Sequence, residues 1–310
     1  MDYNDDARLD TSQVEDTRGS GGGFGGMLGG RGMAVGGGGI GLIGVVVYLV
    51  VALLGGGGGT ASSVLGDLGQ NGQPATADNS QIKSECRTGK DADEHLECAV
   101  VADIDSIQGY WAAELPRLGT PYTPVPTVWF SGQVSTGCGT ADSGAGPFYC
   151  PADKKVYIDL TFYNDLKSQF GATGGPFVNA YVLAHEYGHH VQDLLGTEAK
   201  VRTRSGAKSD SVRLELQADC YAGVWARHAT EPDATGQRLI DSISQQDFAN
   251  ALDAAGRIGD DYIQRNLGGG AVDTSRFTHG SSAQREKWLT TGYRTGDPQQ
   301  CDTFGTDDLG

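Results

Sequence analysis

Three features are missing from this 310-residue chain, and the first two argue against particular classes of protein. There is no long run of lysine or arginine and the formal net charge is −16, so the basic stripe that nucleic-acid binding needs is absent. None of the six cysteines forms a Cys-x-x-Cys pair, which argues against a zinc ribbon or a thioredoxin-like motif. No segment repeats. Hydrophobic residues make up only 38% because 49 glycines, concentrated near the N-terminus, dilute them.

The longest apolar segment lies in a stretch without charged residues between Arg31 and Asp67. Its dense core runs from Ile40 to Leu54, and residues 33–56 together are long enough to cross a bilayer as one helix. A buried soluble helix is the alternative, but the glycine-rich flanks leave nothing to bury it. A cleaved signal peptide fits poorly, because a long polar stretch without a basic start precedes the apolar run.

The domain organisation follows from this expected transmembrane helix. Residues 1–32 are polar and then glycine-rich, so we expect a disordered tail; residues 57–80 read as a flexible linker and residues 81–310 as the folded domain. Arg18 and Arg31 precede the span, and no lysine or arginine follows it until Lys83. The positive-inside rule therefore predicts a single-pass protein of the cell membrane, with a cytoplasmic N-terminus and an extracytoplasmic folded domain.

The cysteine spacing predicts disulfide bonds. Two pairs each close a short loop rich in polar or small residues, and short loops bring their ends together most easily. The remaining two cysteines then form the third pair, although sequence alone does not choose rigorously among the possible connectivities. The alternative is buried free thiols in a cytosolic protein; disulfides would instead imply an oxidising compartment. The expected pairs are Cys86–Cys98, Cys138–Cys150 and Cys220–Cys301.

The periodicity of apolar residues predicts an α+β domain that is mostly helical with a small sheet. One of the two expected strands should border the cleft and pair with an extended peptide. The expected strands are residues 127–132 and 155–160, and the expected helices are residues 99–115, 161–171, 177–195, 210–229 and 238–267.

The most informative short motif is His-Glu-x-x-His at residues 185–189. On a helix, positions i and i+4 share one face, so His185 and His189 can offer two imidazole nitrogens to one zinc ion. Glu186 then lies close enough to act as a general base on a water molecule. His190 points elsewhere around the helix and is expected to support the site or the fold. Histidines satisfied in other ways are the alternative, because this motif also occurs by chance.

A second motif supplies the missing ligand. Catalytic zinc has three protein ligands and one open position, and Glu215 in "SVRLELQADCYAGVWARH" is the candidate third ligand. Asp219 follows four residues later on the same face and would hold His185 through its other ring nitrogen. A solvated acidic face is the alternative. However, the surrounding residues are apolar, and two buried carboxylates without a cation would be costly.

Peptide hydrolysis also needs a donor for the oxyanion of the tetrahedral intermediate. His279 is the first candidate, just before an expected helix start where Ser281 and Gln284 form a capping box. Arg285 or a tyrosine are rival candidates. A loop histidine that only organises the turn remains open as well.

Several long motifs together resemble the neutral zinc metallopeptidases, a bacterial membrane-anchored family. They are "VYIDLTFYNDL", "AHEYGHHVQDLLG", "SVRLELQADCYAGVWA", "IGDDYIQ" and "FTHGSSAQREKWLTTGYRTGDPQQCDTF", within about residues 80–304. The pairing of the two motifs also resembles the gluzincins, which use a glutamate as third zinc ligand. The resemblance implies that His185, His189 and Glu215 bind zinc, that Glu186 is the base, and that Asp219 supports the site.

The expected protein is therefore a membrane-anchored, zinc-dependent endopeptidase with an extracytoplasmic zincin-like domain. Its expected cofactor is Zn²⁺, and its partners are a peptide or protein substrate and, through one helix, the lipid bilayer. The alternative is a non-catalytic binding or scaffold module that zinc holds together. A structural zinc site is more often closed by four Cys or His ligands, and Glu186 would have no use in it.

Overall fold

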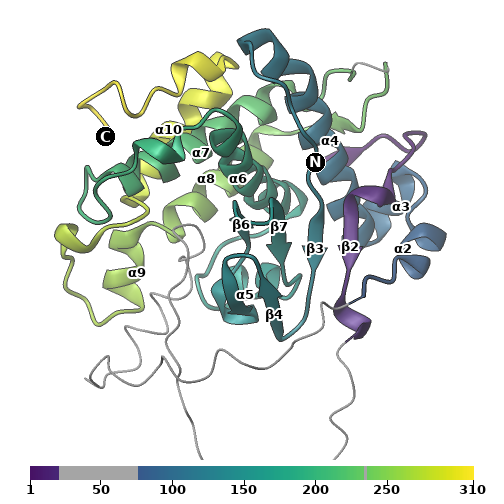
Figure 1. The fold of residues 1–310 in the computed structure, drawn as a ribbon, viewed down its shortest axis with the longest axis horizontal. Helices are drawn as coiled ribbons and strands as arrows, with labels where there is room; N and C mark the ends of the chain where they lie inside the picture. Colours follow the sequence, from purple (N-terminus) through teal and green to yellow (C-terminus); the bar gives the residue numbers. More distant parts are fainter. Residues whose placement is uncertain (21–75, 234–235) are drawn as a thin grey trace, which may run out of the picture.

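The computed structural model describes residues 1–20, 76–233 and 236–310 (Figure 1). The fold is mixed α+β, as the periodicity predicts, with helices around a four-stranded sheet and two smaller pairs of strands. The helices are α2 (Ser80–Glu85), α3 (Gly89–Glu94), α4 (Leu96–Glu114), α5 (Phe162–Ser168), α6 (Pro176–Leu194), α7 (Asp210–His228), α8 (Gln245–Arg257), α9 (Asp260–Asn266) and α10 (Ser282–Thr295). The strands are β1 (Asp2–Tyr3), β2 (Val14–Asp16), β3 (Thr127–Trp129), β4 (Gln133–Thr136), β5 (Gly139–Asp142), β6 (Phe148–Cys150), β7 (Lys155–Ile158) and β8 (Ile240–Ser242).

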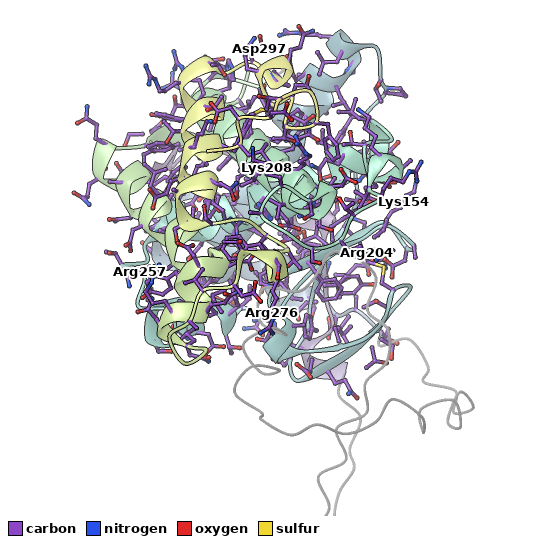
Figure 2. The ribbon with its side chains drawn as sticks, turned by 90° about the vertical axis from the view of Figure 1, so that its left-hand side faces the viewer. Lys154, Arg204, Lys208, Arg257, Arg276 and Asp297 are labelled. Carbon is purple, nitrogen blue, oxygen red and sulfur yellow. A yellow bond between two sulfur atoms is a disulfide. The ribbon has the colours of Figure 1, made fainter. Side chains whose placement is uncertain are left out.

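Helix α7 lies at the centre of the helical layer, packed against α6 on one side and α10 on another (Figure 1). Glycines allow the α7–α10 contact. A Cβ atom at Gly223 would lie 2.2 Å from the carbonyl oxygen of Leu289, and one at Gly292 would lie 1.9 Å from that of Cys220. The two backbones therefore touch, and no side chain fits between them. Figure 2 shows α10 running along one face of the molecule, where Lys208 donates to the Asp307 carbonyl at 2.9 Å.

The main sheet has the strand order β2-β3-β7-β6. β3 pairs in parallel with both β2 and β7, while β6 is antiparallel to β7. The two strands expected from the sequence, β3 and β7, are thus both interior strands with neighbours on each side. The prediction that one of them offers an edge to a peptide is wrong, because β6, which the glycine-rich Cys138/Cys150 loop concealed, forms the edge that contacts α6.

The expected long helix at residues 238–267 is also wrong. This segment contains β8, α8 and α9 instead. The side chain and backbone of Ser244 and Asp247 form a capping box that starts α8. The chain then turns at Gly259, where a Cβ atom would lie 2.4 Å from the Ser282 nitrogen, before α9 begins. Apolar periodicity continues across this turn, so the pattern alone did not reveal the break.

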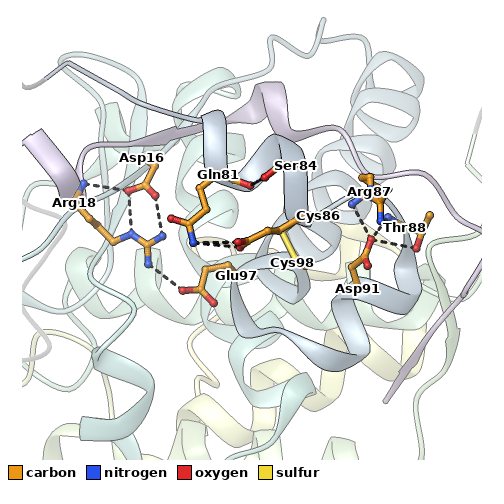
Figure 3. The surroundings of a disulfide bond; sticks show 11 residues. Asp16, Arg18, Gln81, Ser84, Cys86, Arg87, Thr88, Asp91, Glu97 and Cys98 are labelled. Atoms are coloured by element: carbon orange, nitrogen blue, oxygen red, sulfur yellow. Dashed lines mark hydrogen bonds and ion pairs between the residues drawn. A yellow bond between two sulfur atoms is a disulfide. The ribbon is translucent and has the colours of Figure 1, made fainter.

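Residues 1–20 form part of the folded body rather than the expected disordered tail. β1 pairs with β8, and β2 adds a parallel strand to β3. The Tyr3 hydroxyl donates to the buried Asp103 carboxylate at 2.9 Å. Arg18 pairs with Asp16 at 2.8 Å and with Glu97 at 3.2 Å (Figure 3). The residues that make these contacts are isolated from one another in a segment that is otherwise polar. The composition of the segment therefore suggested disorder.

This packing changes the expected membrane topology. One crossing between residues 20 and 76 would place the two halves of the β2–β3 pair on opposite sides of a membrane. A cytoplasmic N-terminus with an extracytoplasmic domain is therefore incompatible with the paired strands. The expected span at residues 33–56 and most of the expected linker lie outside the described residues. Within residues 1–20, 76–233 and 236–310, no helix is long and apolar enough to cross a bilayer.

Three disulfide bonds join the cysteines in the pairs that the spacing predicts. Cys86–Cys98 connects the end of α2 to α4 (Figure 3). Cys138–Cys150 ties the β4–β5 hairpin to β6, with 5.9 Å between the Cα atoms. Cys220–Cys301 joins α7 to the C-terminal segment across 81 positions of sequence. The last bond therefore braces the back of the helix that carries Glu215.

Candidate metal centre

The His-Glu-x-x-His motif lies in the middle of α6, as its pattern predicts. The helix begins at Pro176, whose fixed φ suits the first helical position, after Gly175 with φ +124°. His185 and His189 are buried one turn apart on the same face, with ring centroids 4.8 Å apart. A single ion can therefore reach both rings.

Helix α7 brings Glu215 to the same point. Ser209 caps the helix by accepting a hydrogen bond from the Val212 amide, so the ligand-bearing turns follow a fixed start. α6 and α7 approach closely at Gly188, where a Cβ atom would lie 3.1 Å from the Ala218 Cα. Gly188 is one of the two variable positions of the motif, and its missing side chain allows the two ligand-bearing helices to touch.

The three side chains form a donor set that fits zinc. One atom each of His185, His189 and Glu215 lies within 4.8 Å of the others. The Nε2 atoms of the two histidines lie 3.2 and 3.7 Å from the oxygens of Glu215. Ligand atoms at about 2.0–2.1 Å from a tetrahedral zinc ion are about 3.4 Å apart, so little movement is needed. Among the described residues, this is the one group with metal-ligand geometry.

Both histidines have their remaining ring nitrogen held by an acceptor, which directs Nε2 toward the ion site. His185 Nδ1 lies 2.9 Å from Asp219 Oδ1, the contact expected from the sequence. His189 Nδ1 lies 2.8 Å from Gln192 Oε1, which sequence reasoning missed. Gln192 follows His189 by three positions on one helix face, and that spacing could have identified it. Such outer contacts fix the tautomer and the ring orientation of metal-binding histidines.

Asp219 is the centre of a buried charged network. Arg285 binds it through Nε at 2.8 Å and Nη2 at 2.9 Å, and the Tyr181 hydroxyl donates to it at 2.7 Å. Burial raises the pKa of the Asp219 carboxyl, but the opposing effect of Arg285 and His185 is larger, and the net pKa is lowered to about 2. Arg285, considered as an oxyanion donor, is thus committed to Asp219. Tyr181 precedes His185 by four positions on the same face, a second signal in the spacing.

The carboxylate of Glu186 faces a cavity beside the ion site. Oε2 accepts a hydrogen bond from the backbone N–H of Tyr149 at 3.0 Å. Burial raises the pKa of the Glu186 carboxyl above its ordinary value, the direction that suits a group that must take and return a proton. The residues that line the cavity are Pro147, Phe162, Tyr181, Val182, His185, Glu186, Ile258 and Arg285.

His279 is buried in the loop before α10. Its backbone N–H donates to Asp260 at 2.7 Å, and its Nδ1 lies 2.8 Å from the Thr278 hydroxyl. Burial lowers the pKa of His279, but the opposing effect of the Glu215 and Asp260 carboxylates is larger, so the net pKa is raised. Glu215, the carboxylate that the two histidines of α6 contact, therefore acts on this imidazole electrostatically. Ser281 and Gln284 form the expected capping box behind it.

The fold and site together define a class: a mixed α+β protein in which two packed helices present a His₂Glu set that could hold a metal, beside the carboxylate of Glu186, which is outside that set. The chain belongs to the family described as "Putative neutral zinc metallopeptidase", whose match covers residues 1–304. That match includes the N-terminal strands β1 and β2.

The chain is similar to curated proteins of two bacteria. The uncharacterized protein YpfJ of Escherichia coli K12 is 40% identical over 304 residues, covering 96% of this chain and 97% of the relative. The uncharacterized protein Rv2575 of Mycobacterium tuberculosis H37Rv is 50% identical over 230 residues, covering 73% and 77% respectively. No solved structure gives a significant match.

Proposed function

We propose that the protein is a zinc-dependent endopeptidase, with a zincin-like domain that hydrolyses peptide bonds. The convergence of His185, His189 and Glu215 next to the unused carboxylate of Glu186 carries this proposal. When bound, zinc supplies Lewis-acid polarisation of a carbonyl and lowers the pKa of water toward about 7. The chain's membership in a family described as zinc metallopeptidases also supports zinc-dependent peptide hydrolysis.

The chain's own residues divide the remaining work. Glu186 takes a proton from the attacking water and delivers it to the leaving amine. Asp219 and Gln192 hold the two histidines so that their Nε2 atoms stay directed at the ion site. His279, which is buried and has a raised pKa, is the candidate donor to the oxyanion, because a protonated imidazole can donate.

The cavity beside Glu186 suggests how a substrate side chain is held. Its lining is largely apolar and includes Pro147, Phe162, Val182 and Ile258. A small apolar group next to the scissile bond would displace water from this lining, with a gain of about 0.8 kcal/mol for each CH₂ that it buries. The substrate class would therefore be peptides with an apolar residue at the position that enters the cavity.

We propose that the protein is attached to the membrane, but with a topology that differs from the one expected from the sequence. Residues 33–56 have the composition of a membrane segment, and we propose that they attach the protein to the bilayer. Residues 1–20 and 76–310 would then lie on the same side, because their strands pair. Three disulfides favour the oxidising, extracytoplasmic side.

One experiment separates a peptidase from a zinc-stabilised scaffold. The zinc-loaded protein should hydrolyse an unstructured protein such as casein. Glu186→Gln should retain one zinc per chain and lose hydrolysis, because the change removes a base and no ligand. Glu215→Ala should lose both zinc and hydrolysis. A wild-type protein that binds zinc but cleaves no unfolded protein or peptide would support the scaffold instead.

A further inference from the structure

His190, the third histidine in the α6 motif, has a defined set of partners away from the ion site. It is fully buried, and its Nε2 lies 2.8 Å from the Thr123 carbonyl. A carbonyl only accepts, so Nε2 carries the proton and donates. Its Nδ1 lies 3.1 Å from the hydroxyl of Tyr149, and the two rings are 5.3 Å apart. His190 therefore packs against the Tyr149 ring and offers its Nδ1 as an acceptor beside the hydroxyl.

Asp193 contacts the same hydroxyl. It lies three positions after His190 on α6, and its Oδ2 accepts a hydrogen bond from the Tyr149 hydroxyl at 2.9 Å. Tyr149 is completely buried, so its ring has little room to adopt another position. Asp193 Oδ2 and His190 Nδ1 are thus two acceptors on one helix at the same hydroxyl, whose single proton is donated to Asp193.

The other end of Tyr149 holds the proposed base. Its backbone N–H donates to Glu186 Oε2 at 3.0 Å, so the same helix contacts both the hydroxyl and the amide of one residue. The strand that carries this amide is itself anchored by the Cys138–Cys150 bond at the next position. Because the terminal torsion of a glutamate is broad, an amide bound to one oxygen selects one orientation of the carboxylate.

We infer that Tyr149 is a positioning residue for Glu186, and that His190 and Asp193 act on the carboxylate through it. This inference rests on the proposed peptidase function and names the residues that orient its base. With Oε2 held by the Tyr149 amide, Oε1 is the oxygen available to a water molecule over the ion site. Without the clasp of Tyr149, His190 and Asp193, β6 and its amide can shift relative to α6. A small misplacement of a reacting group is enough to slow the reaction strongly.

Tyr149→Phe tests the clasp, and Tyr157→Phe is its matched control. Both variants remove a hydroxyl that binds an aspartate, at 2.9 Å to Asp193 and at 2.7 Å to Asp153, and both tyrosines are buried on adjacent strands. We expect Tyr149→Phe to lower kcat about 10-fold to 100-fold, with KM and zinc content unchanged. Tyr157→Phe should keep kcat within about twofold of wild type. An equal loss of kcat in both variants would overturn the inference.

A conservative pair at Asp193 separates positioning from packing. Asp193→Asn retains an oxygen that accepts from the Tyr149 hydroxyl and should keep most of the wild-type kcat. Asp193→Ala removes the acceptor and should lower kcat in the same direction as Tyr149→Phe. If Asn and Ala at this position behave alike, the acceptor has no role in orienting Glu186.

A readout without substrate keeps the inference testable if hydrolysis is not found. Amide hydrogen exchange at residue 149 should be about tenfold faster in Tyr149→Phe than in wild type, while Val156, which donates to the Pro126 carbonyl, should be unaffected. Tyr157→Phe should leave the exchange at residue 149 unchanged. Wild-type protection of residue 149 in Tyr149→Phe would contradict the inference about Tyr149. Faster exchange in Tyr149→Phe, together with a wild-type protein that hydrolyses no peptide, would contradict only the peptidase function.

Discussion

Gly188 of α6 lies against Ala218 of α7 with no space for a side chain, since a Cβ atom would lie 3.1 Å from both the Cα and the carbonyl oxygen of Ala218. On α6 this contact lies between His185 and His189, the two candidate metal ligands, and on α7 it lies beside Asp219, which holds His185. The spacing of the two helices at this glycine therefore controls whether the three ligand atoms meet.

Gly188→Ala should weaken the site by separating the helices. Alanine favours a helix by about 1 kcal/mol, but overpacking typically costs about 1–3 kcal/mol, so we expect a net loss of stability together with weaker zinc binding. Gly109→Ala is the control, because its Cβ would meet only the Asp233 side chain, at 4.0 Å, and should raise stability slightly. Calorimetric unfolding and zinc titration measure both effects. Wild-type zinc affinity in Gly188→Ala would show that the helix spacing has no influence.

Asp219→Asn should affect both metal binding and stability. The Arg285 guanidinium is fully buried and would lose its charged partner, which typically costs about 3–5 kcal/mol. Zinc affinity should fall by roughly 10–100-fold, because His185 loses its charged acceptor. Asp253→Asn removes an ion pair to the partly exposed Arg257 and should cost less than about 1 kcal/mol. Urea denaturation and competitive chelation compare the two, and equal small losses would contradict the buried network.

The stability of the protein should fall as pH rises from about 4 to about 8. Burial, together with the charge of Asp10, raises the pKa of the Asp105 carboxyl from 3.8 to about 8. Between these two values the folded state holds a proton that the unfolded chain has released, so the contribution of this group is fully present below pH 4 and lost by pH 8. Asp105→Asn should reduce the decline between pH 5 and pH 8, measured by thermal unfolding. Parallel curves for the two proteins would show that Asp105 is charged in the fold.

Cysteine labelling tests the topology. Asp6→Cys and Asp307→Cys place thiols at exposed positions near the two ends of the described chain. In intact cells with a permeable outer layer, a membrane-impermeant maleimide should label both thiols, because the N-terminal strands pair with the domain. Labelling of Asp307→Cys alone would restore the crossing topology and mean that β1 and β2 are not paired in the membrane-bound protein.

Much of the metal centre could be predicted because its residues are local to two helices. His185 and His189 are one turn apart, as are Glu215 and Asp219, so helical periodicity alone places each pair on a face. The contact between Tyr149 and Glu186 joins residues 37 positions apart, through a three-residue strand that a proline precedes. Such pairings depend on tertiary packing, and no local periodicity encodes them.

The N-terminal strands were hidden for a related reason. Tyr3 and Val14 are buried at 3% and 1% exposure, but they stand singly among polar neighbours. Their partners are Ile240 and Thr127, far along the chain. A short strand that pairs with a strand far along the chain is stabilised by backbone hydrogen bonds to that partner, so it needs little hydrophobic content of its own. Composition therefore predicted a tail where the fold uses two strands.

The pairing of β1 with β8 also means that β1 cannot pair until most of the chain has been synthesised. Asp2 leaves the ribosome well before its partner, Ser242, which is about 240 residues behind it. At roughly 5–20 residues per second, the N-terminal segment waits about 10–50 s before its binding site exists. During that interval it must be kept in the compartment where the domain will fold, and it must remain unpaired. The availability of residues 1–20 at that later time is thus a condition for completing the fold.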